Sequence, residues 1–269
     1  MSGRLYVIAT PIGNLEDVSP RARRLLGAVS AIACEDTRHS RKLLEHFEIR
    51  TPLVSYYREN EAARTVELLA RLAQGEDLAL ITDAGAPLIS DPGARLVADA
   101  VAADITVVPV PGASAVQAAL MAAGLPANAL EPWTFIGFLP ARAGERRRCL
   151  QTWAQTPTAL VFFETPHRLR AALADMEEVW GPDRALAAGR ELTKLHEEFV
   201  RGTVASVRAH FEAHEPRGEF TLVAGLPPAG AVTPPSGDAA PASREEVKAW
   251  AKAHGMTRSE AYRRWQQRG

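Results

Sequence analysis

The stretch Leu78-Ala-Leu-Ile-Thr-Asp-Ala-Gly-Ala-Pro-Leu-Ile-Ser-Asp-Pro-Gly93 decides the fold class of this chain. It opens with a short apolar run typical of a buried strand and continues through a loop of small residues. Asp91 and Pro92 then form a capping aspartate followed by a first-turn proline, which predicts the start of a helix. A strand followed by a helix indicates a crossover between parallel strands, so the stretch predicts an α/β fold.

The same alternation of strands and helices extends along the chain in both directions. Ser19-Pro20 and Thr165-Pro166 repeat the cap-plus-proline start of a helix. The expected strands are Leu5–Ala9, Ala31–Cys34, Leu53–Ser55, Leu78–Thr82 and Ile105–Val108, then Phe135–Leu139, Ala159–Phe163, Arg184–Ala188 and Phe220–Ala224. Helices of the second set are expected at Gly144–Gln155, Pro166–Trp180 and Val204–His214. The first set predicts a mostly parallel sheet and the second a mixed one.

The length of 269 residues suits two domains, and changes in composition indicate where they end. We expect an N-terminal α/β domain at 1–122, a second at 123–226, a Pro/Gly/Ala linker at 227–242 and a helix-turn-helix-like pair at 243–269. This tail carries seven Lys or Arg against three Glu, whereas the whole chain has a net charge of −1. The tail is therefore a candidate for docking a nucleic acid.

Composition excludes several classes of protein. Apolar residues make up 46% and charged residues 23%, which is typical of a globular protein without a chain-wide basic surface. Cys34 and Cys149 lie far apart, which excludes a disulfide scaffold and suits a reducing compartment. Without a signal-like or membrane-spanning run, the chain is predicted to be cytoplasmic. The motifs of P-loops, dinucleotide sites, zinc proteases and serine hydrolases do not occur, and no metal is expected.

Three loops rich in small residues follow expected strands of the first unit. Parallel strands bring their carboxyl ends to one edge, where α/β proteins bind ligands. Small residues let the backbone approach a ligand, and free backbone N–H groups can hold a carboxylate. Three such loops on one edge favour a binding site over three unrelated turns. The loops are Ala9-Thr-Pro-Ile-Gly-Asn14, Thr82-Asp-Ala-Gly-Ala-Pro-Leu-Ile-Ser-Asp-Pro-Gly93 and Pro109-Val-Pro-Gly-Ala-Ser-Ala115.

These loops, together with Cys34-Glu-Asp-Thr-Arg38, resemble the tetrapyrrole-methylase superfamily. Phe163-Glu-Thr-Pro-His-Arg168 and Arg190-Glu-Leu-Thr-Lys194 narrow the resemblance to the family of ribosomal RNA small subunit methyltransferase I. The resemblance implies two α/β domains with S-adenosylmethionine (SAM) in the cleft between them, and a homodimer. It also implies 2′-O-methylation of a cytidine ribose in the decoding region of 16S rRNA, either free or in the small ribosomal subunit.

The resemblance further implies which residues contact the cofactor. The first loop contributes one residue, the second loop most of the set and the third loop two, while two more come from the second domain. The residues are Pro11, Asp83, Ala84, Gly85, Ala86, Ile89, Ser114, Ala115, Glu164 and Leu192.

Methyl transfer from a sulfonium is an in-line displacement that needs alignment and an acceptor for the ribose proton. A carboxylate, a histidine or a neutral lysine could take that proton, and the spacing of the candidates does not choose among them. Our catalytic candidates are Glu35, Asp36 and Lys194, beside Glu164, His167 and Glu191 as further groups at strand ends. RNA also needs basic contacts. The candidates for substrate binding are Arg38, His39, Arg146, Arg147, His167 and Arg168.

Two other functions stay open. A methylase of a small tetrapyrrole would have the same cofactor loops, but it would need neither the basic tail nor the run Glu35-Asp-Thr-Arg38. A non-catalytic nucleic-acid binder would use only the tail and leave the ligand loops without a role. Calorimetry with SAM separates enzyme from binder, and rival acceptors in a methyl-transfer assay separate the two enzymes.

Overall fold

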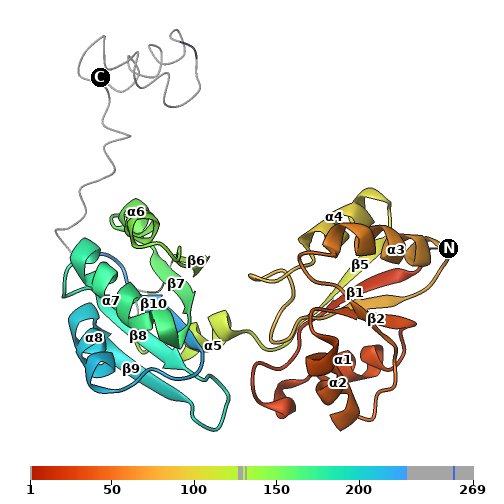
Figure 1. Ribbon diagram of the computed structural model, residues 1–269, viewed down its shortest axis with the longest axis horizontal. Helices are drawn as coiled ribbons and strands as arrows, with labels where there is room; N and C mark the ends of the chain where they lie inside the picture. Colours follow the sequence, from red (N-terminus) through yellow and green to blue (C-terminus); the bar gives the residue numbers. More distant parts are fainter. Residues whose placement is uncertain (1, 127–129, 131, 229–256, 258–269) are drawn as a thin grey trace.

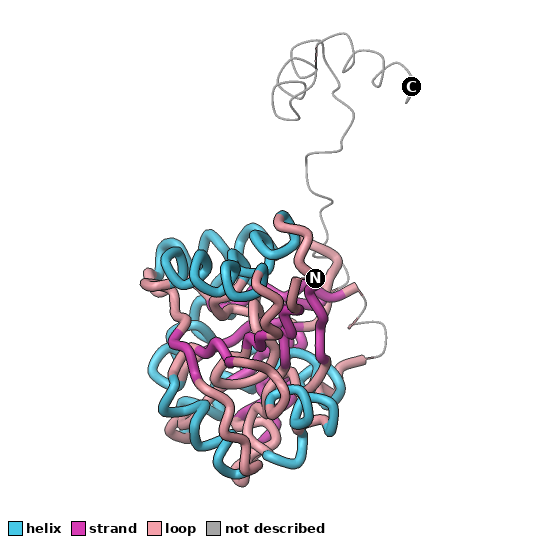
Figure 2. Tube along the Cα trace, turned by 90° about the vertical axis from the view of Figure 1, so that its right-hand side faces the viewer, coloured by secondary structure: helices cyan, strands magenta, loops and turns pink. Residues whose placement is uncertain are grey.

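The computed structural model describes residues 2–126, 130, 132–228 and 257, and within them the chain forms two five-stranded sheets (Figure 1). In the view turned by 90°, helices lie at the outside and strands toward the centre (Figure 2). The α/β class predicted from the sequence is confirmed. The predicted linker from residue 229 onward and the predicted helical pair, except Thr257, lie outside the described residues.

The first sheet, predicted to be mostly parallel, is entirely parallel, with the order β3-β2-β4-β1-β5. Its strands are β1 (Arg4–Ile8), β2 (Ala31–Cys34), β3 (Leu53–Ser55), β4 (Leu78–Leu80) and β5 (Thr106–Val110). The helices are α1 (Pro20–Leu26), α2 (Thr37–His46), α3 (Glu61–Ala73) and α4 (Ala94–Ala102), with a 3-10 turn η1 (Leu15–Asp17). Because every pair is parallel, the loops after β1, β2, β4 and β5 meet at one edge.

Each face of the first sheet has its own apolar core, because successive side chains of a strand point to opposite faces. On one face Ile8 packs with Leu26 of α1 and Leu44 of α2. On the other face Leu5 packs with residues of α3 and α4, among them Leu72. The sheet is therefore sandwiched between α1 and α2 on one side and α3 and α4 on the other (Figure 1).

The second sheet is mixed, as predicted, with the order β6-β7-β10-β8-β9 and a single parallel pair, β6 with β7. Its strands are β6 (Trp133–Phe138), β7 (Ala159–Glu164), β8 (Ala185–Arg190), β9 (Glu198–Thr203) and β10 (Phe220–Ala224). Three helices pack on one face: α6 (Ala143–Trp153), α7 (Pro166–Trp180) and α8 (Val204–Ala213). The sequence prediction missed β9, an edge strand whose charged residues and Gly202 hide the apolar pattern.

Helix α5 (Ala115–Ala122) covers the other face of the second sheet, although its residues belong to the stretch expected in the first domain. Val116 and Ala119 pack with Val161 and Val223 of the second sheet. Arg201 of β9 donates two hydrogen bonds, of 3.1 and 2.7 Å, to the carbonyl at the end of this helix. The chain thus crosses between the sheets immediately before α5, which brings the third ligand loop between them.

The helix start predicted at Asp91 and Pro92 is wrong by two residues. Helix α4 begins at Ala94, and Gly93, with φ of 127°, occupies the N-cap position. The N–H of Gly93 donates to Oε1 of Glu61, at 3.1 Å, so another helix supplies the capping oxygen. Asp91 is thereby left free to line a cavity instead of capping a helix.

No helix in the described part of the chain is long and apolar enough to cross a membrane.

Candidate active site

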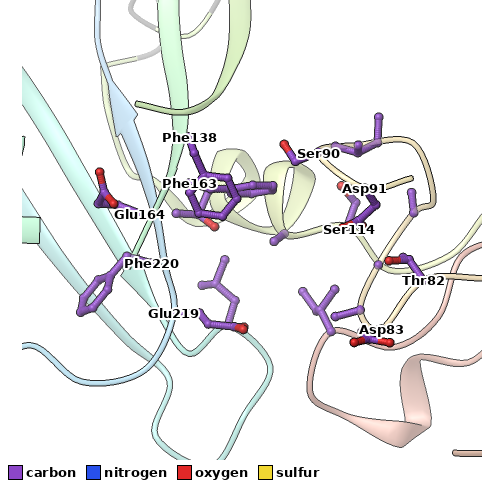
Figure 3. A pocket seen from close by; sticks show the side chains of 18 of the residues that line it. Thr82, Asp83, Ser90, Asp91, Ser114, Phe138, Phe163, Glu164, Glu219 and Phe220 are labelled. Atoms are coloured by element: carbon purple, nitrogen blue, oxygen red, sulfur yellow. The ribbon is translucent and has the colours of Figure 1, made fainter. Parts of the chain in front are cut away.

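A cavity of about 370 Å³ lies between the ligand loops of the first sheet and the carboxyl ends of strands in the second (Figure 3). Figure 3 shows Thr82, Asp83, Ser90, Asp91 and Ser114 on one side, with Phe138, Phe163 and Glu219 on the other. The remaining lining residues are Ile12, Glu35, Ala84, Gly85, Ala86, Ile89, Ala115, Glu164, Thr165, Leu192, Lys194, Phe220 and Thr221. The volume lies within the usual range of small-molecule sites.

The first two ligand loops are joined to each other at the cavity. The backbone N–H of Thr10 donates to the carbonyl of Gly85 at 2.9 Å, and the N–H of Gly85 donates back at 3.1 Å. The hydroxyl of Thr10 donates to the carbonyl of Thr82 at 3.1 Å. A Cβ added at Gly85, which has φ of 81°, would lie 3.3 Å from Cγ2 of Ile12. Glycine is therefore required where these loops meet.

The third ligand loop ends at the N-terminus of α5. The hydroxyl of Ser114 accepts the N–H of Gln117 at 3.5 Å, so Ser114 is the N-cap. The N–H groups of the first helical turn have no acceptor within a helix, and the helix dipole makes this end positive. Ser114 and Ala115 both line the cavity. This corner of the cavity suits a carboxylate.

Carboxylates line the wall formed by the first unit. Burial raises the pKa of Glu35 above its ordinary value, and the charges of Asp91 and Asp83 raise it further. Burial also raises the pKa of Asp91. A hydrogen bond from Thr82 lowers this pKa in part, and the charge of Asp83 raises it slightly. Like charges at short range repel, and a cation placed among these carboxylates would favour their ionised forms and so lower both pKa values. The wall is therefore suited to a positively charged ligand.

Asp36 differs from Glu35 and Lys194 in its place relative to the cavity. Its backbone N–H donates to Oδ1 of Asp83 at 3.2 Å, but Asp36 does not line the cavity. Its carboxylate accepts the N–H and the guanidinium of Arg38, which lower its pKa to about 2. A carboxylate with so low a pKa is a weak proton acceptor. In this arrangement Asp36 caps α2, and Arg38 is its exposed partner.

Lys194 lines the cavity from the loop after β8. Its Nζ donates to Oε1 of Glu191 and to Oε2 of Glu219, each at 2.9 Å. Burial lowers the pKa of Lys194, but the two carboxylates outweigh burial, so the pKa lies above its ordinary value. A protonated lysine cannot accept the ribose proton, and it acts instead as a fixed positive charge between two carboxylates.

An aromatic wall faces the carboxylates, and the sequence reasoning missed it. The strand β6 has an irregular register between Phe135 and Gly137, where Ile136 is the extra residue. The bulge turns Phe138 to the same face as Phe163, with ring centroids 5.6 Å apart. Phe138 is 50% exposed although it is a large apolar side chain. Bulges re-aim side chains near active sites, but alternation alone would have placed Phe138 on the opposite face.

Three arginines predicted to bind RNA each have a carboxylate partner within the protein. Arg146 is 5% exposed and donates to Oδ2 of Asp175 at 2.6 Å. Arg147 donates to Oδ1 of the same carboxylate at 2.8 Å. Arg168 lies 3.4 Å from Oε1 of Glu164. Arg146 and Arg147 thus join α6 to α7, whereas Arg168 joins the start of α7 to the end of β7 and to the carbonyl of Leu139. All three lie outside the cavity lining. His39 and His167 are exposed and also lie outside it.

The structure brings most of the expected cofactor residues together. All of the ten except Pro11 line the one cavity, and Pro11 is buried beside Ile12, which lines it. Glu164 differs from the other lining residues in its orientation, because its carboxylate points away from the loops of the first sheet (Figure 3). Burial raises the pKa of this carboxyl above its ordinary value. Of the catalytic candidates, Glu35 and Lys194 line the cavity.

The cavity suits the charges of SAM. The ligand carries a positive sulfonium and a carboxylate, and the cavity offers acidic residues and a helix N-terminus. Gly85 lines the cavity without a side chain, at a position where a Cβ would press on Ile12. No group of three side chains suited to a metal ion occurs in residues 2–126, 130, 132–228 and 257.

Comparison with known proteins identifies the family. The sequence model for "Tetrapyrrole (Corrin/Porphyrin) Methylases" matches residues 4–208. A protein of Synechocystis sp. named ribosomal RNA small subunit methyltransferase I is 46% identical over 221 residues, covering 82% of this chain and 78% of that protein. The chain belongs to the ribosomal RNA small subunit methyltransferase I family. A relative of the same name from Pseudomonas aeruginosa is 49% identical, covering 83% of this chain and 79% of the relative.

Solved structures share the fold of this ribosomal RNA small subunit methyltransferase I family member. A uroporphyrin-III C-methyl transferase from Thermus thermophilus, complexed with S-adenyl homocysteine, matches with a TM-score of 0.59 and 16% identity, covering 82% of this chain and 97% of that one. A diphthine synthase matches with a TM-score of 0.64 and 12% identity, covering 83% of this chain and 90% of the diphthine synthase. The predicted resemblance to tetrapyrrole methylases is thus confirmed in both sequence and fold.

Proposed function

We propose that this chain transfers a methyl group from SAM to the 2′-hydroxyl of a cytidine ribose in the decoding region of 16S rRNA. The observation that carries the proposal is the cavity between the two sheets, where three loops and two second-unit residues expected to contact SAM converge. The curated relatives, at 43–49% identity, are named for methylation of small-subunit rRNA. Their identity to this chain far exceeds that of the tetrapyrrole enzymes, which share the fold at 16–21% identity.

The loops of the first unit hold the methyl donor. Ala84, Gly85 and Ala86 offer backbone at close range, while the start of α5 faces the carboxylate of the ligand. Asp83 and Asp91 stabilise its positive charge. When bound, SAM supplies a methyl group that is already activated, so the protein mainly aligns it with the acceptor oxygen. Alignment alone can supply about 7–11 kcal/mol of the barrier.

Glu35 is the proton acceptor we propose among the three catalytic candidates. It lines the cavity, and its raised pKa makes it a stronger base than an ordinary carboxylate. Asp36 has a pKa of about 2 and Lys194 is held protonated, so neither suits the role. The proton of the ribose hydroxyl would pass to the Glu35 carboxylate as the oxygen takes the methyl group. A general base within reach of the hydroxyl accelerates such a reaction roughly 10²–10⁴-fold.

RNA would present one splayed-out nucleotide to the cavity, because a ribose inside a helix cannot reach its depth. Phe138, half exposed at the cavity, supports this assignment because unstacked bases pack on aromatic rings. Arg38, His39 and His167 are exposed and remain proposed RNA contacts. We also propose that the chain acts as a homodimer in the cytoplasm, where small ribosomal subunits occur.

The deciding experiment maps ribose methylation at nucleotide resolution after incubating the protein and labelled SAM with small ribosomal subunits. Naked 16S rRNA and a tetrapyrrole serve as rival acceptors in parallel reactions. We expect a single 2′-O-methylated cytidine in the decoding region and no labelled tetrapyrrole. A labelled tetrapyrrole with unmodified rRNA would overturn the proposed acceptor, while failure to bind SAM in calorimetry would overturn the proposed donor.

A further inference from the structure

An unpaired basic surface among the described residues lies on α1, on α2 and just after α2, on the face of the first sheet opposite α3 and α4 (Figure 1). Its basic side chains are exposed, and none forms an ion pair with a described residue. This contrasts with the second unit, where Arg146, Arg147 and Arg208 are neutralised by carboxylates. The residues of the surface are Arg21, Arg23, Arg24, Arg41, Lys42 and Arg50.

A groove of about 500 Å³ lies within this basic surface. Arg23 and Arg24 form its charged side, and Phe47 and Ile49 contribute apolar surface. The guanidinium carbon of Arg23 lies 5.3 Å from the centre of the Phe47 ring. The remaining lining residues are Val18, Pro20, Gly27 and Ala28. The groove thus combines an aromatic and apolar surface with two cations that have no carboxylate partner in the described residues.

We propose that this groove is a second RNA subsite, which binds one nucleotide outside the acceptor position. The inference rests on the proposed function and deepens it, because it names where the body of the protein holds the rRNA. Guanidinium groups pair with phosphate oxygens in a two-pronged geometry, and aromatic rings and guanidinium planes stack on unpaired bases. A nucleotide presents both a phosphate and a flat apolar base, and so it matches both halves of the groove.

Helix α2 connects this subsite with the cavity. Glu35 lines the cavity directly before the helix, and Asp36, its N-cap, bonds to Asp83. Phe47, at the other end of the helix, lines the groove. Ten helical residues span about 15 Å. Arg41 and Lys42 lie on the exposed side between the two ends, so a strand of RNA leaving the cavity would meet positive charge along the helix.

The test measures binding of full-length protein to a 16S rRNA transcript at a series of salt concentrations. In the variant Arg23→Gln with Arg24→Gln, we expect affinity to fall about tenfold or more near physiological salt. Each lost phosphate contact lowers the slope of log affinity against log salt by about 0.7 for single strands. The slope should therefore become shallower by about 1.4. Phe47→Leu keeps the apolar volume but removes the ring, and should weaken binding about fivefold with little change in slope.

A matched control changes the same number of charges on the opposite face of the same sheet. Arg64→Gln with Arg95→Gln removes two arginines whose partners, Glu67 and Asp99, are partly exposed. This variant should bind rRNA within about twofold of the unchanged protein, since removing such exposed ion pairs has little effect. SAM affinity by calorimetry should be the same in all variants, which shows that each is folded.

Three outcomes would overturn the subsite. The groove variant could bind rRNA as tightly as the control, both could lose affinity equally, or the groove variant could change its oligomeric state in light scattering and keep its RNA affinity. The last result would make the groove a contact between copies of the chain. None of these readouts depends on methyl transfer. Failure of the proposed function would instead appear as unmethylated rRNA with the unchanged protein.

Discussion

Thr10 and Gly85 form an isolated antiparallel bridge that ties the loop after β1 to the loop after β4. Both hydrogen bonds of the bridge are present, at 2.9 and 3.1 Å between nitrogen and oxygen. The two residues are 75 positions apart in the chain, yet their pairing sets one wall of the cavity. The bridge works only with a residue at position 85 that tolerates a positive φ and leaves room for Ile12.

Replacing Gly85 by alanine should therefore weaken SAM binding. The new Cβ would meet Ile12 at 3.3 Å in a backbone conformation that costs an L-residue about 1–2 kcal/mol. We expect SAM affinity in calorimetry to fall about tenfold. Gly144→Ala is the control, because a Cβ there has nothing within 4 Å. Equal affinity of the two variants would show that the loop junction does not shape the ligand site.

The carboxylates of the cavity predict a pH dependence of SAM binding. Glu35 and Asp91 have raised pKa values, so in the free protein they ionise above the ordinary range near pH 4. Since a raised carboxyl pKa means that the folded state holds the proton more tightly, their ionisation lowers the free energy of unfolding as pH rises through this interval. A sulfonium bound beside them favours the ionised forms, and SAM affinity should rise over the same interval.

Calorimetry of SAM binding from about pH 4 to about pH 8 checks this dependence. The neutral product S-adenosylhomocysteine provides the control, because it lacks the sulfonium charge and should bind with a flatter pH profile. Asp91→Asn should flatten the profile of SAM toward that of the product. Parallel profiles for the two ligands would mean that these carboxylates do not face the sulfur.

Replacing Phe138 by alanine should affect the acceptor more than the donor. The ring is half exposed and reaches the cavity only through the bulge in β6, so its loss creates no internal void. We expect the KM for rRNA to rise about fivefold or more, as for a lost stacking contact, with SAM affinity within about twofold. Phe138→Tyr should keep the KM near its original value. A variant with weaker SAM binding and an unchanged KM for rRNA would assign the ring to the donor.

Replacing Arg146 by alanine should destabilise the fold. The guanidinium and the carboxylate of Asp175 have side chains that are each 6% exposed, and their separation is 2.6 Å. Removing one partner of a buried pair costs about 3–5 kcal/mol, because the other charge is left without its partner. Because Arg147 still contacts Asp175, we expect the free energy of unfolding, measured with denaturant, to fall by about 3 kcal/mol, the low end of this range. The exposed neighbour Arg148, changed to alanine, should alter the free energy of unfolding by no more than about 0.5 kcal/mol.

The sequence by itself determined the local elements and the order in which they occur. The strands Ala31–Cys34 and Phe220–Ala224 and the helix Pro166–Trp180 have the predicted bounds, because apolar runs, caps and prolines act over a few residues. The small-residue loops were also visible, since glycine and proline constrain the backbone wherever they occur. From their position after parallel strands, the convergence of these loops on a single edge followed without tertiary contacts.

Tertiary structure alone decided what depends on residues far apart in the chain. The packing of α5 on the second sheet, the bulge that aims Phe138 and the burial of Arg146 against Asp175 have no local signal. The same holds for the choice among the catalytic candidates. Residue type and spacing did not choose among Glu35, Asp36 and Lys194, whereas burial and neighbouring charges give each a different pKa shift. Electrostatic and packing energies depend on distance in space, which the order of residues does not fix.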